Sequence, residues 1–279
     1  MRMLVTGGTG LLGGRLIPKL VADGHQVFAL TRSTSSHARL QAMGATPVDA
    51  DLESGAPPVL PLIDAVVHAA AMFRFSGPRK PFFRTNTDGT AALLKAAGSA
   101  GARTFVYISA AGIIMDDDGT PVRNADESAP VFTHHFSAYL ASKARAEALV
   151  LAANQTGFRT IALRPPALWG PGDPFGRALP DAVGSGRFAF IDRGDYVFST
   201  CHVDNVIEAI RCALERGEGG RAFFIKDRGE QTFRAFVASL ASVQGLSIDK
   251  LGSMPYWLAS AVGRLLDAIW AVARKDGDP

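Results

Sequence analysis

The sequence has little cysteine and no concentration of charge of one sign. Its 279 residues include two cysteines, Cys201 and Cys212, and carry a formal net charge of +3. Two thiols without a second pair exclude a cysteine-based metal site, and we interpret them as apolar fillers in a reducing compartment rather than a disulfide. Lysine and arginine are scattered and form no basic run. We therefore expect neither a bound metal nor a nucleic-acid partner.

Long hydrophobic runs are also absent. The most apolar stretch, residues 256–273, is interrupted by Arg264 and Asp267 and is short of a membrane span. Its apolar side chains recur at helical spacing, at Leu258, Val262, Leu265, Leu266, Ile269 and Trp270. This pattern predicts an amphipathic helix that packs on its own domain, with contact to a membrane surface or to a second subunit as the less favoured alternative. Because the first predicted strand begins at Met3, we see no room for a signal peptide and expect a cytoplasmic protein.

What the sequence does contain is a regular alternation of apolar strands and helices. Strands are predicted over residues 3–6, 26–30, 46–48, 65–68, 104–109 and 160–163. Helices are predicted over residues 11–23, 90–100 and 138–155. Strands that alternate with helices of this length imply βαβ units and a parallel sheet with right-handed crossovers.

The texture of the sequence changes after Arg164. Prolines and glycines crowd residues 165–176, which predicts a loop region. Beyond it we expect apolar segments at 188–191 and 196–201, a strand at 222–225, and helices at 203–216, 233–244 and 256–273. The predicted fold is α/β: a Rossmann doubly wound parallel sheet with helices on both faces over residues 1–165, and a small C-terminal substrate lobe. That lobe, residues 166–279, is interleaved with the last strands and helices of the Rossmann domain.

A glycine-rich turn follows the first predicted strand directly. Gly7, Gly10 and Gly13 stand at three-residue spacing where this strand runs into the helix over 11–23. At such a turn the backbone can pass close to the pyrophosphate of a dinucleotide, whose charge lies at the helix N-terminus. The alternative is an ordinary tight turn, which the combination of strand, glycines and helix makes the less favoured interpretation.

Tyr139 and Lys143 lie four residues apart in the predicted helix over 138–155, so they share one helix face. A phenol titrates near ~10 in isolation. A neighbouring ammonium favours the phenolate and lowers the pKa of the phenol, which makes a tyrosine usable as an acid or base. The spacing alone could arise by chance, and the position of the pair relative to the glycine turn favours the catalytic interpretation.

Taken together, the glycine spacing and the Tyr139–Lys143 pair resemble the extended short-chain dehydrogenase/reductase superfamily. This branch contains sugar-nucleotide epimerases and dehydratases, 3β-hydroxysteroid dehydrogenases and dihydroflavonol-type reductases, and the last two are the most similar in pattern. Further motifs match in family order at Asp51-Leu52, residues 67–71, residues 86–90, residues 164–171 and residues 202–204. The resemblance covers nearly the whole chain.

The resemblance implies a nicotinamide dinucleotide cofactor and assigns residues to it. Lining the pyrophosphate would be Gly7, Thr9, Gly10, Leu11, Leu12 and Gly13. Asp51 and Leu52 would meet the adenine. The nicotinamide half would lie near Ala69, Ala70, Ala71, Thr85, Tyr139, Lys143 and Pro166.

The end of the second predicted strand bears on which dinucleotide is bound. An acidic side chain there would hydrogen-bond the ribose 2′-hydroxyl of NAD and repel the 2′-phosphate of NADP. This chain has Thr31, Arg32 and Ser33 instead. A guanidinium suits a phosphate, although a plain surface arginine is the alternative. We predict that NADP(H) is preferred, with NAD as the alternative cofactor.

By the same resemblance, Tyr139 protonates a carbonyl oxygen, or deprotonates an alcohol in reverse, while Lys143 hydrogen-bonds the nicotinamide ribose. Family members usually carry a further small hydroxyl residue after the fifth strand, at the position of Ala110 in this chain. Ser109, one position earlier, is therefore the candidate third catalytic residue, and a structural serine is an equally favoured interpretation. Substitute donors could come from Thr133, His134, His135 and Ser137, which are more simply explained as loop residues.

Two positions bear on the substrate class. Members that act on nucleotide sugars have an asparagine after the sixth strand and an arginine before the His-Val-Asp segment, where this chain has Ala167 and Phe198. A diphosphate would lose a donor and a charge-assisted bond. The sequence instead gathers apolar and aromatic residues, at Met72, Phe73, Phe75, Phe188, Phe190, Tyr196 and Phe198, some of which are expected to be core.

We therefore predict an NADP(H)-dependent oxidoreductase that transfers a hydride between nicotinamide and the carbonyl or secondary alcohol of a rather apolar small molecule. One alternative is a sugar-nucleotide epimerase or dehydratase with tightly bound NAD. The other is a non-catalytic dinucleotide-binding protein, which only Ala110 favours. The resemblance also implies a homodimer, formed through the helices over 90–100 and 138–155.

Overall fold

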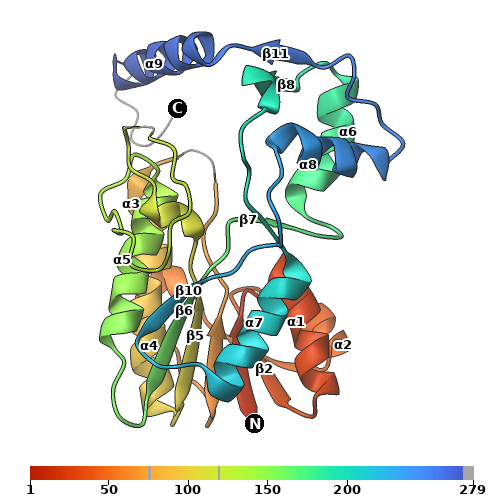
Figure 1. The fold of residues 1–279 in the computed structure, drawn as a ribbon. Coiled ribbons are helices and arrows are strands. Elements are labelled where there is room, and N and C mark those ends of the chain that lie inside the picture. The colour runs from red at the N-terminus through yellow and green to blue at the C-terminus, as the bar shows by residue number, and fades with distance from the viewer. Residues whose placement is uncertain (75–76, 119, 273–279) are drawn as a thin grey trace. The chain divides into compact units, whose positions relative to one another are not determined.

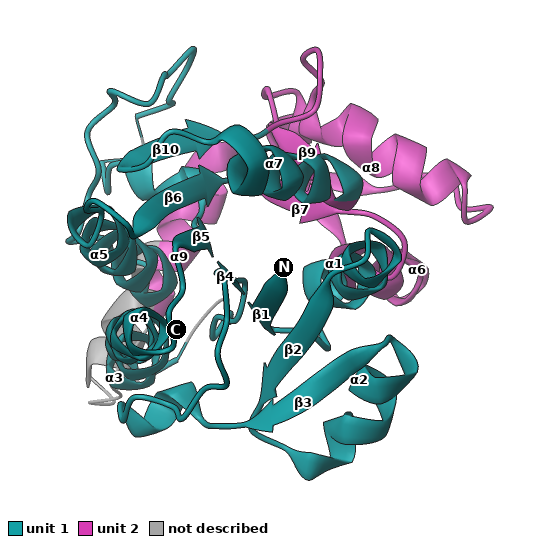
Figure 2. Cartoon of the chain, turned by 90° about the horizontal axis from the view of Figure 1, so that it is seen from below, with its two compact units in different colours: residues 1–165, 204–225, 276–278 teal, residues 166–203, 226–275, 279 magenta. Residues whose placement is uncertain are grey.

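The computed structural model describes residues 1–74, 77–118 and 120–272, which divide into two compact units (Figures 1 and 2). Unit 1 comprises residues 1–165 together with residues 204–225. Unit 2 comprises residues 166–203 and the described residues from 226 onward. Each unit therefore contains segments that are far apart in the sequence.

Unit 1 is built on a seven-stranded sheet with the strand order β10-β6-β5-β4-β1-β2-β3, in which every pairing is parallel. The strands are β1 (Arg2–Thr6), β2 (Gln26–Thr31), β3 (Ala45–Asp49), β4 (Ala65–His68), β5 (Thr104–Ile108), β6 (Arg159–Arg164) and β10 (Arg221–Phe224). This confirms the predicted Rossmann sheet. Chain order reverses between β1 and β4, and such a switch point is where doubly wound sheets bind their ligands.

Helices cover both faces of this sheet (Figure 2). On one face lie α1 (Leu11–Ala22), α2 (His37–Ala42) and α7 (Val203–Arg216). On the other lie α3 (Arg79–Phe82), α4 (Gly89–Ser99) and α5 (Ala138–Ala152). A turn of π-helix, Phe83–Asp88, joins α3 to α4. The core on this second face includes Leu93 of α4, Phe105 and Tyr107 of β5, and Ala146 and Val150 of α5.

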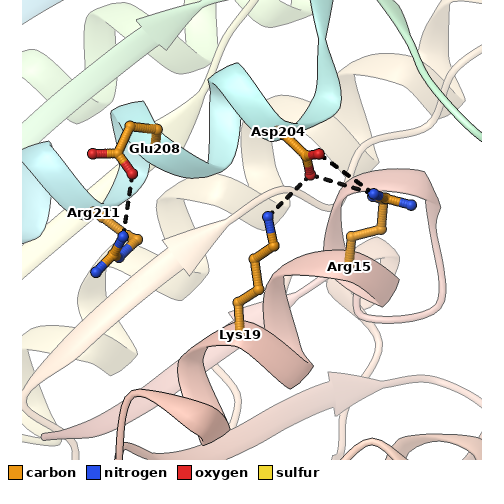
Figure 3. Close-up of polar contacts among 5 residues, drawn as sticks. All are labelled: Arg15, Lys19, Asp204, Glu208 and Arg211. Carbon is orange, nitrogen blue, oxygen red and sulfur yellow. Dashed lines mark hydrogen bonds and ion pairs between the residues drawn. The ribbon is translucent and has the colours of Figure 1, made fainter.

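Helix α7 packs beside α1, although some 180 residues separate them in the sequence (Figure 3). The carboxylate of Asp204 accepts hydrogen bonds from Lys19 at 3.1 Å and from Arg15 at 3.4 Å. Arg211 of α7 pairs with Glu208 at 3.2 Å. Such half-exposed pairs stabilise a protein only slightly. The buried stripe of α7 contributes more, through Val203, Val206, Ile207 and Ile210.

The described part of unit 2 contains two small parallel sheets and three α-helices. β7 (Ala167–Trp169) pairs with β9 (Thr200–His202), and β8 (Ala189–Ile191) pairs with β11 (Gly252–Met254). The helices are α6 (Pro174–Gly184), α8 (Phe233–Ser242) and α9 (Tyr256–Val272). A core of its own is formed by Leu179, Phe190, Val237 and Ala241.

Helix α6 begins inside the segment predicted as loop. Asp173 caps it, accepting a hydrogen bond from the Gly176 N–H at 2.7 Å, and Pro174 is its first residue. A capping carboxylate followed by proline is a helix-start signal that outweighs the local glycine and proline content. The predicted segment 196–201 is a strand only from Thr200, and the predicted strand over 104–109 ends at Ile108.

Helix α9 is present as predicted, but four of its apolar side chains are exposed rather than buried in the core of unit 2. Leu258, Val262, Leu265 and Leu266 are 37%, 43%, 61% and 50% exposed. The side chains of Ile269 and Trp270, part of the same pattern, lie outside the described residues. None of the helices in the described ranges is long and apolar enough to cross a bilayer. Cys201 and Cys212 are both free thiols, in agreement with the prediction of no disulfide.

Candidate active site

The glycine turn after β1 packs directly against the chain that follows β4. Gly7 has a φ of +71°, and its carbonyl accepts a hydrogen bond from Gly10 N–H at 3.0 Å. A Cβ on Gly13 would stand 2.3 Å from the Gly7 oxygen, and a Cβ on Gly7 would stand 2.9 Å from Ala70 N. Thr9 and Gly10 are exposed at the tip of the turn, where α1 begins. The turn thus leaves open backbone at a helix N-terminus, which suits an anion.

Thr6, at the end of β1, begins a chain of buried hydrogen bonds centred on His68. The Thr6 hydroxyl accepts from Ala70 N–H at 2.9 Å and lies 2.7 Å from Nδ1 of His68. On its other side, Nε2 of His68 lies 2.9 Å from the Thr90 hydroxyl, which itself donates to the Asn86 carbonyl. Thr90 must therefore accept from Nε2–H, so Nε2 of His68 carries a proton. Burial, and secondarily the charge of Lys143, lowers the pKa of His68 to about 3.

Asn86 carries the same network on to helix α5. Its side-chain amide bonds both the N–H and the carbonyl of Met72, at 2.7 and 3.1 Å. It also donates to the Ser142 hydroxyl at 2.9 Å, and Ser142 donates to the Tyr139 carbonyl at 2.7 Å. The network joins the end of β1, the loop after β4 and the start of α5, three parts of the predicted site. His68 and Asn86 lie within the matching segments 67–71 and 86–90, but their role in this network depends on contacts between residues far apart in the sequence.

Lys143 is buried at 2% exposure and held against β5. Its ammonium donates to the Ile108 carbonyl at 2.5 Å and lies 4.1 Å from the centre of the Tyr107 ring. A cation over an aromatic face is attracted by the ring. Burial lowers the pKa of Lys143 to about 7, and Glu147 acts in the opposite direction.

Tyr139 lies one turn earlier on α5, partly buried, with the ring of Phe73 edge-on at 5.0 Å. Burial raises the pKa of its phenol to about 12. The predicted net lowering of this pKa is therefore wrong for this structure, because desolvation, which disfavours the phenolate, is the dominant influence. The phenol is protonated at neutral pH, which is the form that can donate a proton.

Ser109 follows the last residue of β5. Its N–H bonds the Leu163 carbonyl at 2.7 Å, and its buried hydroxyl has no hydrogen-bond partner among the described residues. Two of the substitute donors have local tasks instead. Ser137 caps α5 by accepting from Leu140 N–H, and His135 Nδ1 accepts from Ser137 N–H at 2.9 Å.

At the adenine end, the predicted residues lie at the ends of β2 and β3. Arg32 is exposed immediately after β2. Asp51 is also exposed and accepts from Glu53 N–H at 2.9 Å, while Leu52 is buried against Gly89. The structure adds one residue that sequence reasoning missed. Nη2 of Arg39, on α2, lies 3.5 Å from where a Cβ on Gly14 would stand, beside the first turn of α1.

Two further predicted residues border these elements. Thr85 lies in the π-helical turn before α4, and its buried hydroxyl has no partner in the described chain. Pro166 is the second residue after β6 and the first residue of unit 2. Within the described ranges, no group of three or more His, Cys, Asp or Glu side chains could hold a metal ion.

Unit 2 contains four of the aromatic residues that the sequence singled out, Phe188, Phe190, Tyr196 and Phe198. Phe198 packs against Phe233 at 5.0 Å between ring centres, and Tyr196 stacks on Phe233 at 5.6 Å. Phe188 and Phe190 belong to the core of the unit, as expected for part of the group. Tyr196 is 43% exposed and presents an aromatic surface. Phe75 lies outside the described residues.

Comparison with known proteins finds relatives that match along nearly the whole of this chain. Residues 4–256 match the model of the 3-beta hydroxysteroid dehydrogenase/isomerase family. The chain is 38% identical over 273 residues to a 4-hydroxy-2-methyl-3-oxo-4-farnesyl-3,4-dihydroquinoline-1-oxide ketoreductase of Stigmatella aurantiaca, covering 97% of this chain and 81% of the relative. It is 32% identical to a 2-alkyl-3-oxoalkanoate reductase of Stenotrophomonas maltophilia, covering 100% of this chain and 86% of the relative.

A sterol-4-alpha-carboxylate 3-dehydrogenase of Dictyostelium discoideum is 30% identical, over 99% of this chain and 87% of its own length. Among solved structures, dTDP-glucose 4,6-dehydratase of Streptomyces venezuelae, determined with NAD, has a TM-score of 0.76 at 23% identity, over 91% of this chain and 84% of its own. That likeness shows the fold alone. The chain belongs to the 3-beta hydroxysteroid dehydrogenase/isomerase family of extended short-chain dehydrogenase/reductases, and it is an NAD(P)-dependent oxidoreductase that acts on hydroxyl or carbonyl groups.

Proposed function

We propose that this protein is an NADP(H)-dependent carbonyl reductase, or alcohol dehydrogenase in reverse, for a rather apolar small molecule. Tyr139 is the acid or base, and Lys143 assists it. The observation that carries this proposal is the arrangement on α5. A protonated phenol stands one helical turn from a buried lysine, which β5 holds through the Ile108 carbonyl and the Tyr107 ring.

The chemistry follows from the protonation states of these two groups. Bound NADPH would supply the hydride to the carbonyl carbon. Tyr139, with its pKa raised to about 12, keeps its proton at neutral pH and donates it to the carbonyl oxygen as negative charge develops there. An ammonium on Lys143 lowers the cost of the phenolate that is left behind. Ser109 has a buried hydroxyl without a partner in the described chain, and it would be a further donor near the end of β5.

The residues of unit 1 suit a dinucleotide. The glycine turn approaches its neighbours so closely that a Cβ on Gly13 would overlap the Gly7 carbonyl, which leaves its outer side to a pyrophosphate. Thr85 offers a buried hydroxyl that bonds nothing else described. Arg32 is exposed directly after β2, and Nη2 of Arg39, on α2, lies beside the first turn of α1, so two arginines follow β2 within eight residues. A 2′-phosphate would be bound by such a pair, which favours NADP over NAD.

An apolar substrate is favoured by the surroundings of Tyr139 and by the relatives. Phe73 is 57% exposed although its ring contacts Tyr139, so an apolar surface adjoins the phenol. The relatives act on a farnesylated quinoline oxide, on 2-alkyl-3-oxoalkanoates and on sterol carboxylates. Phe198, where sugar-nucleotide members have an arginine, packs its ring against Phe233 and Phe236. These observations disfavour a nucleotide sugar.

Oxidation of NADPH over a panel of aromatic, steroid and 2-alkyl-3-oxo carbonyl compounds tests the function, with Tyr139→Phe as the key variant. We expect turnover for the wild type and a loss of roughly 100-fold or more in kcat for Y139F, because general acid catalysis contributes about that much. Cofactor binding should change little. Tyr256→Phe removes an exposed hydroxyl from α9 and serves as the matched control.

Three outcomes would contradict the proposal. If Y139F keeps full activity, Tyr139 is not the acid. If the purified protein retains NAD without exchange and reduces no added carbonyl compound, the result favours a sugar-nucleotide epimerase or dehydratase. If it binds NADPH but oxidises none of it over the whole panel, a non-catalytic dinucleotide-binding protein is the better description.

The preference for NADP over NAD can be tested separately by substituting Arg32 and Arg39. We expect Arg32→Ala and Arg39→Ala each to raise KM for NADPH by roughly 10-fold, because each removes charge-assisted hydrogen bonds to a phosphate. The KM for NADH, which lacks that phosphate, should stay nearly constant. Arg221→Ala, at the start of β10, is the control. An equal effect of the arginine variants on both cofactors would contradict the preference for NADP.

A further inference from the structure

The helix face that carries Tyr139 and Lys143 extends by one more turn to Glu147. Residues four apart on a helix lie on the same face, so these three side chains form a row. Lys143 and Glu147 are both 2% exposed, whereas Tyr139 is only partly buried. The row thus runs from the candidate acid into the core, where it ends in a carboxylate.

Arg164 fixes this carboxylate. Its Nε donates to the two oxygens of Glu147 at 3.1 and 3.0 Å, and its Nη2 donates to Oε1 at 2.6 Å. Arg164 is the last residue of β6, is 3% exposed, and lies over the ring of Phe224 at 5.3 Å. Apolar side chains of similar volume would give comparable or greater stability than such a buried ion pair. The charges of the pair also act on ionisable groups nearby.

The ionisable group on which the charge of Glu147 acts is Lys143. Burial lowers the pKa of Lys143 to about 7, and the negative charge of Glu147 raises it. The groups that face Lys143 from the sheet supply no compensating negative charge. Tyr107 of β5 presents its ring, its own pKa well above the ordinary value for tyrosine through burial, and His68 of β4 is neutral above about pH 3. On α5 itself, Tyr139 is a neutral phenol at neutral pH.

We propose that Glu147 is a positioning residue that acts through Lys143 and keeps it in the ammonium form. Arg164 holds the carboxylate in place and, through its own positive charge, limits the strength of this effect. The proposal rests on the proposed function in one respect: an ammonium on Lys143 is what would assist Tyr139. In this row, the carboxylate of Glu147 stabilises the ammonium of Lys143, and the ammonium in turn assists Tyr139, the proton donor.

The experiment measures the protonation of Lys143 directly. The chain has seven lysines, so ¹³C resonances of the Cε atoms of labelled lysine can be followed one by one with pH, and Lys143→Met assigns the relevant signal. We expect Glu147→Gln to move the titration midpoint of Lys143 down by about one pH unit or more. The double variant E147Q/R164Q also removes the repelling guanidinium. Its Lys143 midpoint should lie between those of E147Q and the wild type.

Glu208→Gln is the matched control, because it also removes a carboxylate paired with an arginine, but on α7. It should leave the Lys143 midpoint unchanged. A merely structural role for Glu147 predicts no ordered shift across the variants. If E147Q does not fold, the double variant carries the comparison, since two neutral amides replace the ion pair, and its midpoint should still lie below that of the wild type. An unchanged midpoint in the folded variants overturns the proposal.

Activity separates this inference from the proposed function. In the reductive direction, the alkaline limb of the pH profile of NADPH oxidation should move to lower pH in E147Q, together with the Lys143 midpoint. If the midpoint moves but no carbonyl is reduced by the wild type, the proposed function fails and the inference stands. If carbonyls are reduced and the midpoint does not move, the inference fails alone.

Discussion

At the scale of single residues, His68 makes the stability of unit 1 depend on pH in the mildly acidic range. Its imidazole bonds Thr6 through one nitrogen and Thr90 through the other, and it is 1% exposed. Burial and the charge of Lys143 lower its pKa from 6.5 to about 3 in the folded protein. Between these two values the unfolded chain binds a proton that the folded chain does not. Stability from this residue is therefore complete above pH 6.5 and is lost as the pH falls toward 3.

We predict that the free energy of unfolding decreases below about pH 6.5 by up to about 1.4 kcal/mol per pH unit on account of His68. Urea titrations at pH 7, 6 and 5 measure this, with His68→Gln as the comparison. The variant lacks the titrating group, so its free energy of unfolding should fall less steeply as the pH is lowered. At pH 7 its free energy of unfolding should be lower than that of the wild type. Parallel curves for the two proteins would mean that His68 does not control the acid response.

At the scale of elements, the glycines of α1 and α4 show how context decides what a glycine does. Both Gly13 and Gly98 lie within helices. A Cβ on Gly13 would stand 2.3 Å from the Gly7 carbonyl, whereas a Cβ on Gly98 would meet nothing within 4 Å. The first glycine permits the close packing of β1, its turn and α1, and the second only adds flexibility to the unfolded chain.

We therefore expect opposite effects from the same substitution. Gly13→Ala should destabilise the protein by about 1–3 kcal/mol through overpacking and should weaken NADPH binding, because the turn must open. Gly98→Ala should stabilise it by about 0.5–1 kcal/mol and leave NADPH binding unchanged. Thermal unfolding and fluorescence titration with NADPH measure both effects. A stable Gly13→Ala protein with normal affinity would contradict the role of the turn.

At the scale of the whole molecule, the chain leaves unit 1 after Pro165 and returns to it at Asp204. The returning segment supplies α7, whose Asp204 bonds Lys19 and Arg15 of α1, and β10, which pairs with β6 at the sheet edge (Figure 3). The helical period of residues 203–216 and the apolar strand after them are visible in the sequence. The sequence does not show that these elements pack on α1 and pair with β6, because such packing depends on which apolar faces meet in space.

Local features could be predicted from the order of the residues alone: the strand–helix alternation, the glycine turn at Gly7, and the shared helix face of Tyr139 and Lys143. These follow from short-range periodicity and backbone conformation, which a chain carries wherever it is placed. Only the tertiary structure decided the electrostatics. Desolvation raises the pKa of Tyr139, opposite to the expectation from its neighbour. The packing of α5 on β6 places the carboxylate of Glu147 on the guanidinium of Arg164. Burial is a property of the packed core, and no spacing along the chain reports it.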